Sequence, residues 1–159
     1  MKTINALYPG TFDPFHLGHL EVVLRAARLF DKVIVGVAED SSKNARSSES
    51  RVRLAAAALG GTGMKNIAVE AFSGAATDFA AKNNCLVVVR GIRSILDAEY
   101  EKGLSKIYRQ LAAVEVVCLM CHEYEHVSGS VIRQLAKIGV DLAGFVPLQI
   151  KDAVAELYK

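Results

Sequence analysis

The chain has 159 residues, enough for one domain with a single substantial hydrophobic core. Its 19 lysine and arginine residues nearly balance 17 aspartate and glutamate residues, which argues against a general nucleic-acid-binding surface. No apolar run is long enough to span a bilayer, and the first residues lack the apolar core of a signal peptide. We therefore expect a cytoplasmic protein of one domain, residues 1–159, that binds neither nucleic acid nor membrane.

Apolar β-branched runs alternate with helical patterns along the chain. Strands are expected at residues 3–7, 32–38, 67–71, 86–90 and 114–120, and helices at 19–30, 49–59, 75–83, 95–111, 130–138 and 147–158. Residues 33–35 and 86–89 are continuous apolar runs, typical of strands buried on both faces of a parallel sheet. The pattern predicts an α/β fold: a single doubly wound, Rossmann-like domain with a five-stranded parallel sheet and right-handed crossovers.

The segment after the first expected strand is Tyr-Pro-Gly-Thr-Phe-Asp-Pro-Phe-His-Leu-Gly-His, residues 8–19. A strand, a turn rich in glycine and proline, and a helix start together favour phosphate binding, because the helix N-terminus offers unpaired N–H groups and a partial positive charge. Thr11 adds a hydroxyl donor, and His16 and His19 add imidazole donors. The other interpretations are an ordinary turn with incidental histidines and a metal-binding histidine pair, which lacks a nearby cysteine or carboxylate to complete a tetrahedral set.

Polar side chains also follow each of the later strands. Asp40, Ser42 and Lys43 follow the second, Ser73 and Gly74 the third, Arg90 and Arg93 the fourth, and residues 122–130 the fifth. In open α/β sheets the ligand site lies at the carboxyl ends of the strands. Five loops are therefore expected to converge on one site.

Several groups on these loops suit phosphate chemistry. The guanidiniums of Arg90 and Arg93, expected on one turn, can form paired hydrogen bonds to phosphate oxygens, but salt bridges to acidic residues of the segment 97–101 would also explain them. Lys43 is either a mobile cation suited to charge that grows during a reaction or a solvated loop lysine. Ser-Gly-Ser at 128–130 precedes a helix, where it can cap the helix, bind an anion, or do both.

The three cysteines are expected to be reduced, because their number is odd and no secretion signal is evident. Cys118 and Cys121 have C-x-x-C spacing, but they end a Val/Leu-rich strand, whereas a redox pair normally sits at a helix N-terminus. We interpret them as structural, and no metal site is predicted.

Six short motifs occur in order and together resemble bacterial phosphopantetheine adenylyltransferase, of the HIGH-type nucleotidyltransferase superfamily. They are Tyr-Pro-Gly-Thr-Phe-Asp-Pro at 8–14, Gly-His at 18–19, Ser-Lys at 42–43, Arg-Gly-Ile-Arg at 90–93, Asp-Ala-Glu-Tyr-Glu at 97–101 and Ser-Gly-Ser at 128–130. The resemblance spans nearly the whole chain. It implies one nucleotidyltransferase domain that transfers the adenylyl group of ATP to 4′-phosphopantetheine, giving dephospho-coenzyme A and pyrophosphate in the penultimate step of coenzyme A synthesis. It also implies Mg²⁺ with ATP, a homohexamer, and inhibition by coenzyme A.

The resemblance also implies roles for single residues. The catalytic residues would be His19, Lys43 and Arg93, and 4′-phosphopantetheine would contact Thr11, Lys43, Ala76 and Arg90. ATP would contact Thr11, Phe12, His19, Gly91, Ile92, Arg93, Glu101, Tyr124, Glu125, His126, Val127, Ser128, Gly129 and Ser130. His19 and Lys43 would act as electrostatic stabilisers, with no covalent intermediate and no general base.

Four features depart from the family pattern. Residues 16–19 read His-Leu-Gly-His where Thr-Asn-Gly-His is usual, and Gly129 replaces a serine. Ala76 stands where a bulky apolar residue is usual, and Ile107-Tyr108 replaces Met-Asn. The last two lie on the wall expected for the pantetheine arm.

Two other functions remain open from the sequence. One is adenylyl transfer to nicotinate mononucleotide, whose enzymes are usually longer and are disfavoured by the segments at 90–93 and 97–101. The other is a non-catalytic nucleotide-binding module, which the full set of phosphate-side donors disfavours. A dehydrogenase is disfavoured because no Gly-x-Gly-x-x-Gly turn follows the first strand.

Overall fold

The computed structural model describes residues 3–39 and 46–159. Within these ranges, five parallel strands form one sheet in the order β3-β2-β1-β4-β5: β1 (Asn5–Gly10), β2 (Lys32–Ala38), β3 (Ile67–Phe72), β4 (Cys85–Ile92) and β5 (Glu115–Met120). The helices are α1 (Leu17–Leu29), α2 (Ser48–Gly60), α3 (Ala76–Lys82), α4 (Ile95–Leu111), α5 (Gly129–Lys137), the 3₁₀ helix η1 (Leu148–Ile150) and α6 (Lys151–Leu157). No helix in the described part of the chain is both long and apolar enough to cross a membrane. The predicted doubly wound α/β fold is confirmed.

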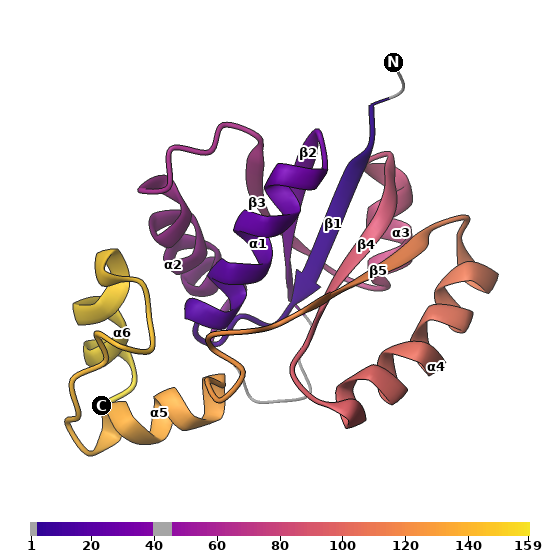
Figure 1. Cartoon of the computed structure of the whole chain (residues 1–159). Coiled ribbons are helices and arrows are strands. Elements are labelled where there is room, and N and C mark those ends of the chain that lie inside the picture. The colour runs from indigo at the N-terminus through magenta and orange to yellow at the C-terminus, as the bar shows by residue number, and fades with distance from the viewer. Residues whose placement is uncertain (1–2, 40–45) are drawn as a thin grey trace.

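Helices cover both faces of the sheet (Figure 1). α1 and α2 lie on one face, over a large core that includes Val33 and Val35, and α3 and α4 lie on the other, over a smaller core that includes Ile34. Successive strand residues point to opposite faces, so neighbours in β2 enter different cores. This is why the strand reads as a continuous apolar run rather than as an alternating one.

The sheet opens between β1 and β4. β1 pairs with β2 along its whole length, but with β4 only from Asn5 to Leu7. The chain also reverses its order here, since β2 and β3 lie on one side of β1 and β4 and β5 on the other. Such a switch point, at the carboxyl ends of the strands, is where open α/β sheets bind their ligands.

Several element boundaries differ from those predicted, among them those of β1, β4 and α6. The first strand continues to Gly10 instead of ending at residue 7, because its ladder with β2 runs on to the pair Gly10–Val37. β4 continues to Ile92, paired with Met120, so Arg90 lies inside a strand and the prediction of two arginines on one turn is wrong. The helix predicted at 147–158 is divided at Ile150, whose φ of −116° and ψ of 1° are not helical.

Candidate active site

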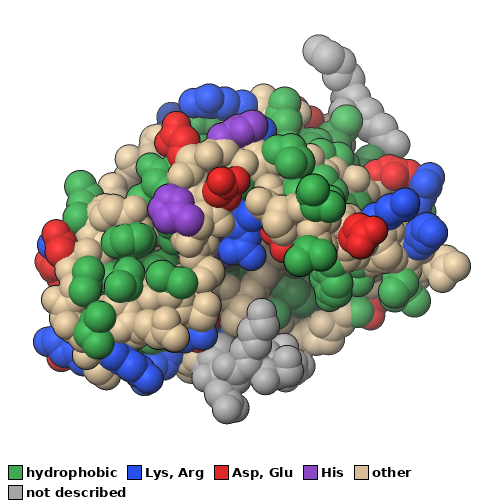
Figure 2. Space-filling view, turned by 60° about the horizontal axis from the view of Figure 1, so that its bottom comes forward, with side chains coloured by type: hydrophobic (Ala, Val, Ile, Leu, Met, Phe, Trp, Pro, Cys, Tyr) green, Lys and Arg blue, Asp and Glu red, His purple; other side chains and the backbone are tan. Residues whose placement is uncertain are grey.

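A cavity of about 730 Å³ opens at the carboxyl ends of the strands. Viewed from that end, the surface is hollowed near its centre and basic side chains border the opening (Figure 2). The wall combines the loop after β1, the ends of β2, β3 and β4, and the starts of α1, α3 and α5. The predicted convergence of loops is thus confirmed for the first, third, fourth and fifth. In the second loop, Asp40, Ser42 and Lys43 lie outside the described residues.

The predicted site residues divide into those that line the cavity and those that do not. Lining it are Thr11, Phe12, His19, Ala76, Arg90, Gly91, Arg93, Ser128, Gly129 and Ser130. Not lining it are Ile92 and Val127, which are buried, and Glu101, Tyr124, Glu125 and His126. Lys43 lies outside the described residues. The roles of all these residues remain predictions.

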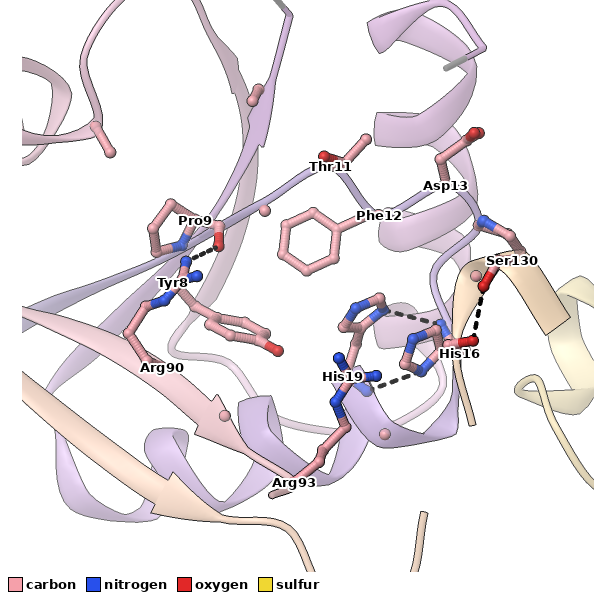
Figure 3. Close-up of a pocket in the computed structure, with 18 of the residues that line it drawn as sticks. Tyr8, Pro9, Thr11, Phe12, Asp13, His16, His19, Arg90, Arg93 and Ser130 are labelled. Atoms are coloured by element: carbon pink, nitrogen blue, oxygen red, sulfur yellow. Dashed lines mark hydrogen bonds between the residues drawn. The ribbon is translucent and has the colours of Figure 1, made fainter. Parts of the chain in front are cut away.

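His16 and His19 cap the helix that carries them (Figure 3). Nδ1 of His16 accepts a hydrogen bond from the backbone N–H of His19, and Nδ1 of His19 accepts one from the backbone N–H of His16, each at 3.3 Å. This reciprocal capping starts α1 at Leu17, two residues before the predicted start. The two rings stack with their centroids 3.5 Å apart.

Gly18, the third residue of the His-Leu-Gly-His motif, is required by close packing. A Cβ at this position would lie 3.1 Å from the His16 ring and 3.3 Å from the backbone oxygen of Tyr124. Without a side chain, the helix start fits beneath the loop that follows β5. The histidine spacing therefore builds a compact helix terminus in which the rings themselves satisfy backbone donors.

Both histidines are neutral near pH 7 because of their surroundings. Burial lowers the pKa of His16 to about 3, and the charge of Arg93 adds to the effect. Burial, then His16 and Arg93, also hold the pKa of His19 well below its usual value. Since Nδ1 of each ring is an acceptor, the ring proton is on Nε2. His19 can therefore donate one hydrogen bond through Nε2 without carrying a charge.

Arg93 and the serines at the start of α5 supply further donors. Arg93 donates to the backbone oxygen of Val127 at 3.3 Å, and its Nε lies 3.5 Å from Oδ2 of Asp97. Ser128 caps α5 by accepting from the N–H of Val131 at 3.4 Å, and its hydroxyl lies 3.0 Å from that of Ser130. The predicted capping role is confirmed, while anion binding by the same serines remains a prediction.

Arg90 is held in the opening between β1 and β4. Its Nε and Nη2 donate to Oε1 of Glu101 at 2.8 and 2.7 Å, and its Nη1 donates to the backbone oxygen of Pro9 at 3.1 Å (Figure 3). Burial opposes the positive charge, but hydrogen bonding to Glu101 and the charge of Glu101 outweigh burial and raise the pKa of Arg90. Salt bridging, the alternative interpretation of these arginines, is thus present for both, although each still lines the cavity.

Phe72, Ala76 and Tyr108 line the same cavity as Arg90. Ala76 and Tyr108 both pack against the smaller core, one at the start of α3 and the other in α4. Burial raises the pKa of Tyr108, with Arg90 opposing the shift and Glu101 reinforcing it. We name Phe72, Ala76, Arg90 and Tyr108 the arginine side of the cavity, and the loop after β1 with the starts of α1 and α5 the histidine side.

Sequence reasoning missed several lining residues, of which Asp13 and Arg133 matter most. Asp13 lies within the first motif but received no role, and its carboxylate is bonded to residues far along the chain. Arg133 was detectable in principle, because it stands three residues after Ser130 and so shares its helix face.

The cysteines are unpaired: Cys85 and Cys121 are buried and Cys118 is exposed. Burial is the main cause that raises the pKa of all three thiols, so they are poor nucleophiles near neutral pH. Within residues 3–39 and 46–159, no group of three His, Cys, Asp or Glu side chains is arranged to hold a metal ion.

Comparison with known proteins places the chain in a family. Residues 7–135 match the family model described as cytidylyltransferase-like. The phosphopantetheine adenylyltransferase of Thermomicrobium roseum is 43% identical over 160 aligned residues, which cover 97% of this chain and 95% of that protein. The chain belongs to the phosphopantetheine adenylyltransferase family. Another member, from Moorella thermoacetica, is 40% identical over 96% of each chain. The recognition made from the six motifs is confirmed.

Solved structures of adenylyltransferases share the fold of this family member. A bifunctional NMN adenylyltransferase/ADP ribose pyrophosphatase from Francisella tularensis matches 98% of this chain with a TM-score of 0.74 and 18% identity, and this chain covers 50% of its length. A Vibrio parahaemolyticus protein described as a nicotinate-nucleotide adenylyltransferase matches 99% of this chain with a TM-score of 0.75 and 17% identity, over 96% of its own length. At such identities the likeness shows a common fold.

Proposed function

We propose that this chain transfers the adenylyl group of ATP to 4′-phosphopantetheine, releasing dephospho-coenzyme A and pyrophosphate in the penultimate step of coenzyme A synthesis. The observation that carries the proposal is the cavity at the switch point. It brings a neutral imidazole donor, His19, and a half-buried guanidinium, Arg90, to the wall of one space. Family membership at 43% identity to a phosphopantetheine adenylyltransferase supports this acceptor.

ATP would bind on the histidine side. The N-termini of α1 and α5, the hydroxyls of Ser128 and Ser130, His19 and Arg93 offer donors suited to a chain of phosphates. The acceptor would bind on the arginine side, with its phosphate on Arg90 and its arm along Ala76 and Tyr108. Lys43, expected to contact the same phosphate, lies outside the described residues.

The proposed reaction needs alignment and charge stabilisation rather than a covalent intermediate. An oxygen of the acceptor phosphate attacks the α-phosphorus of ATP, a new O–P bond forms, and the bond to the leaving pyrophosphate breaks. His19 would stabilise charge on the phosphates through Nε2–H, as a fixed donor that requires no reorganisation. Removing one such donor typically slows an enzyme by about 10²–10³.

Mg²⁺ would arrive with ATP. This ion prefers oxygen ligands, and in nucleotide sites it is commonly held by the phosphates and one or two carboxylates. In the part of the cavity wall that the structure describes, the only acidic residue is Asp13, whose carboxylate accepts hydrogen bonds from Tyr158 and Arg46. The described residues therefore do not form a protein-built Mg²⁺ site, and we assign no step to the ion.

We also propose that the outer face of α4 is buried in a homohexamer. Ile95, Leu96, Tyr100, Ile107 and Leu111 are all exposed on this helix, and Met120 is exposed on the neighbouring edge strand β5. Apolar side chains gather on this side of the molecule (Figure 2). An apolar area of this kind commonly marks a protein interface. Light scattering should give six times the mass of the chain, and Leu96→Glu should lower it.

Coenzyme A should act as an inhibitor, because it contains the pantetheine arm and would occupy the arginine side. Its inhibition should weaken when 4′-phosphopantetheine is raised. The cytoplasmic location expected from the sequence remains a prediction.

The decisive experiment is mass detection of dephospho-coenzyme A and pyrophosphate from ATP, Mg²⁺ and 4′-phosphopantetheine, with nicotinate mononucleotide as the parallel acceptor. We expect kcat/KM to favour 4′-phosphopantetheine by at least about 10³, since a site that pairs buried polar groups with one substrate rejects a mismatched one strongly. Equal or reversed preference would contradict this acceptor but not adenylyl transfer. ATP binding without either product would indicate a non-catalytic module.

A further inference from the structure

The segment from Thr11 to Asp13 has a backbone conformation that needs support. Phe12 has a φ of 51°, in the left-handed region that bulky residues rarely adopt. Its buried ring lies edge-on to the His19 ring, with centroids 4.8 Å apart, and also contacts Tyr8. The position of His19 therefore depends on a strained turn that the surrounding structure must hold in place.

Two arginines from distant helices bind the carbonyl groups on either side of Phe12. Nη1 of Arg51, in α2, donates to the backbone oxygen of Thr11 at 2.6 Å. Nη1 of Arg133, in α5, donates to the backbone oxygen of Asp13. Arg51 is buried and also donates to the backbone oxygen of Arg46 at 2.7 Å. Hydrogen bonds from a charged donor are the stronger kind, so the turn is clamped at both ends.

The carboxylate of Asp13 is held from the C-terminus of the chain. Its Oδ1 accepts from the hydroxyl of Tyr158, which follows α6, and from the backbone N–H of Arg46 at 3.4 Å. Its Oδ2 lies 3.6 Å from Nη1 of Arg133. Tyr158 is itself buried, with the guanidinium of Arg46 over its ring at 5.4 Å from the centroid. The carboxylate points away from His19 (Figure 3).

Gly129 shows how closely α5 fits this turn. A Cβ at position 129 would lie 2.7 Å from the backbone oxygen of Asp13 and 3.3 Å from Nη1 of Arg133. The glycine that replaces a serine of the family pattern thus lets α5 approach until Arg133 reaches Asp13. α5 and α6 also lie together at the same end of the molecule (Figure 1).

We propose that Tyr158 is a positioning residue for nucleotide binding and adenylyl transfer, acting through Asp13. Its hydroxyl keeps the Asp13 carboxylate turned away from His19, and so holds the turn that places Phe12 and His19. An unheld carboxylate could rotate toward the cavity, where its charge would repel the phosphates of ATP. The proposal rests on the function proposed above only for its activity assay. The contacts on which it is based do not depend on that function.

Tyr158→Phe tests the hydroxyl alone, because the ring remains to pack against Arg46. We expect kcat to fall about tenfold and KM for ATP to rise several-fold, as for the loss of a hydrogen bond to a charged group. KM for 4′-phosphopantetheine should change less than KM for ATP, because its phosphate is assigned to Arg90, which Glu101 and Pro9 hold in place. Glu156→Gln, which alters a carboxylate on α6 that is 74% exposed, should behave as the unaltered chain.

Two further measurements separate positioning from general stability. In an Asp13→Asn background, Tyr158→Phe should change kcat by less than about threefold, because residues that act through one another are not additive. Amide hydrogen exchange at residues 11–16 should be faster in Tyr158→Phe than in Glu156→Gln. Equal losses of kcat in both backgrounds, or a lower Tm with unchanged kcat and KM for ATP, would overturn the proposal.

The outcome does not depend on whether the acceptor is correct. If the unaltered chain forms no dephospho-coenzyme A, the proposed function fails, and calorimetric binding of ATP then replaces the assay. Weaker ATP binding by Tyr158→Phe with faster exchange at residues 11–16 would still support the positioning role. Unchanged ATP binding and unchanged exchange would overturn it.

Discussion

The histidine side and the arginine side of the cavity are built on different electrostatic principles. On the histidine side, His16 and His19 are uncharged and are oriented by backbone groups three residues away. On the arginine side, Arg90 is a permanent cation whose partners, Glu101 and Pro9, come from other elements. A neutral fixed donor suits a place where charge develops during reaction, and a fixed cation suits a place that binds a charge already present.

The largest effect of this difference between the two sides is expected at His19. His19→Ala should keep the fold and lower kcat by about 10²–10³, with a smaller change in either KM, because a donor to the transition state is lost. Steady-state kinetics and circular dichroism measure the two effects. His122→Ala, at an exposed position, is the matched control and should leave kcat unchanged. A fall of less than about tenfold would mean that His19 is not the contact proposed.

The arginine side should respond mainly through binding. Arg90→Ala should raise KM for 4′-phosphopantetheine by at least about tenfold and KM for ATP much less. The change also leaves the carboxylate of Glu101, only 5% exposed, without its cation, so stability should fall as well. Adding Glu101→Gln should recover stability but not KM, which separates the two effects.

Arg109→Ala is the control for this pair of variants. Its ion pair with Glu115 has exposures of 67% and 63%, and exposed pairs contribute little to stability. Neither KM nor the unfolding midpoint should change appreciably. If Arg90→Ala raised both KM values equally, Arg90 would have a structural role instead.

A moderate effect is expected from the titration of His16. Its pKa is lowered to about 3 from 6.5, so the unfolded chain binds more protons than the folded chain between these pH values. The contribution of His16 to the free energy of unfolding is therefore fully present above about pH 6.5. It decreases as the pH falls from 6.5 toward 3, and the loss is about 2 kcal/mol at pH 5. Asn is also a good helix N-cap, so His16→Asn should reduce the pH dependence without removing the cap. Urea unfolding at about pH 7.5 and 5 measures how the free energy of unfolding changes with pH in both chains. If His16→Asn shows the same change as the unaltered chain, the lowered pKa is contradicted.

The smallest effect is expected at the cysteines. Cys118→Ser should leave kcat unchanged under oxidising and reducing conditions, and Cys121→Ser should leave kcat equally insensitive to redox state, because burial raises both thiol pKa values. Activity assays with and without a reductant test this. Oxidative loss of turnover in the unaltered chain, rescued by either change, would show a regulatory role.

Much of the fold was predictable because its signals are local. The apolar run at residues 33–35 within the predicted strand 32–38 and the helical pattern of residues 95–111 led to element bounds that the structure reproduces. The motif at residues 8–19 indicated a phosphate site from its strand, turn and helix start alone. Alternation of strands and helices then placed five loops at one edge, because crossovers between parallel strands have one hand.

The same local signals also led to family membership, and with it to the proposed chemistry and to ten of the residues that line the cavity. They could not show that β4 continues beyond Arg90 to Ile92, since that boundary depends on the length of the ladder with β5. Nor could they show that His16 and His19 cap their own helix, because a side chain with two nitrogens offers several partners. Burial, which makes both rings neutral, likewise depends on what covers them.

Only the tertiary structure decided the contacts between residues that are far apart in the chain. Tyr158 meets Asp13 across 145 positions, Arg133 meets it across 120, and Arg90 meets Pro9 across 81. No periodicity links such pairs, because periodicity records which face of an element is buried and not which element covers it. The sequence by itself determined the sheet, the phosphate motif and the family. Packing of the helices around the switch point decided how the motif is held and which charges face the cavity.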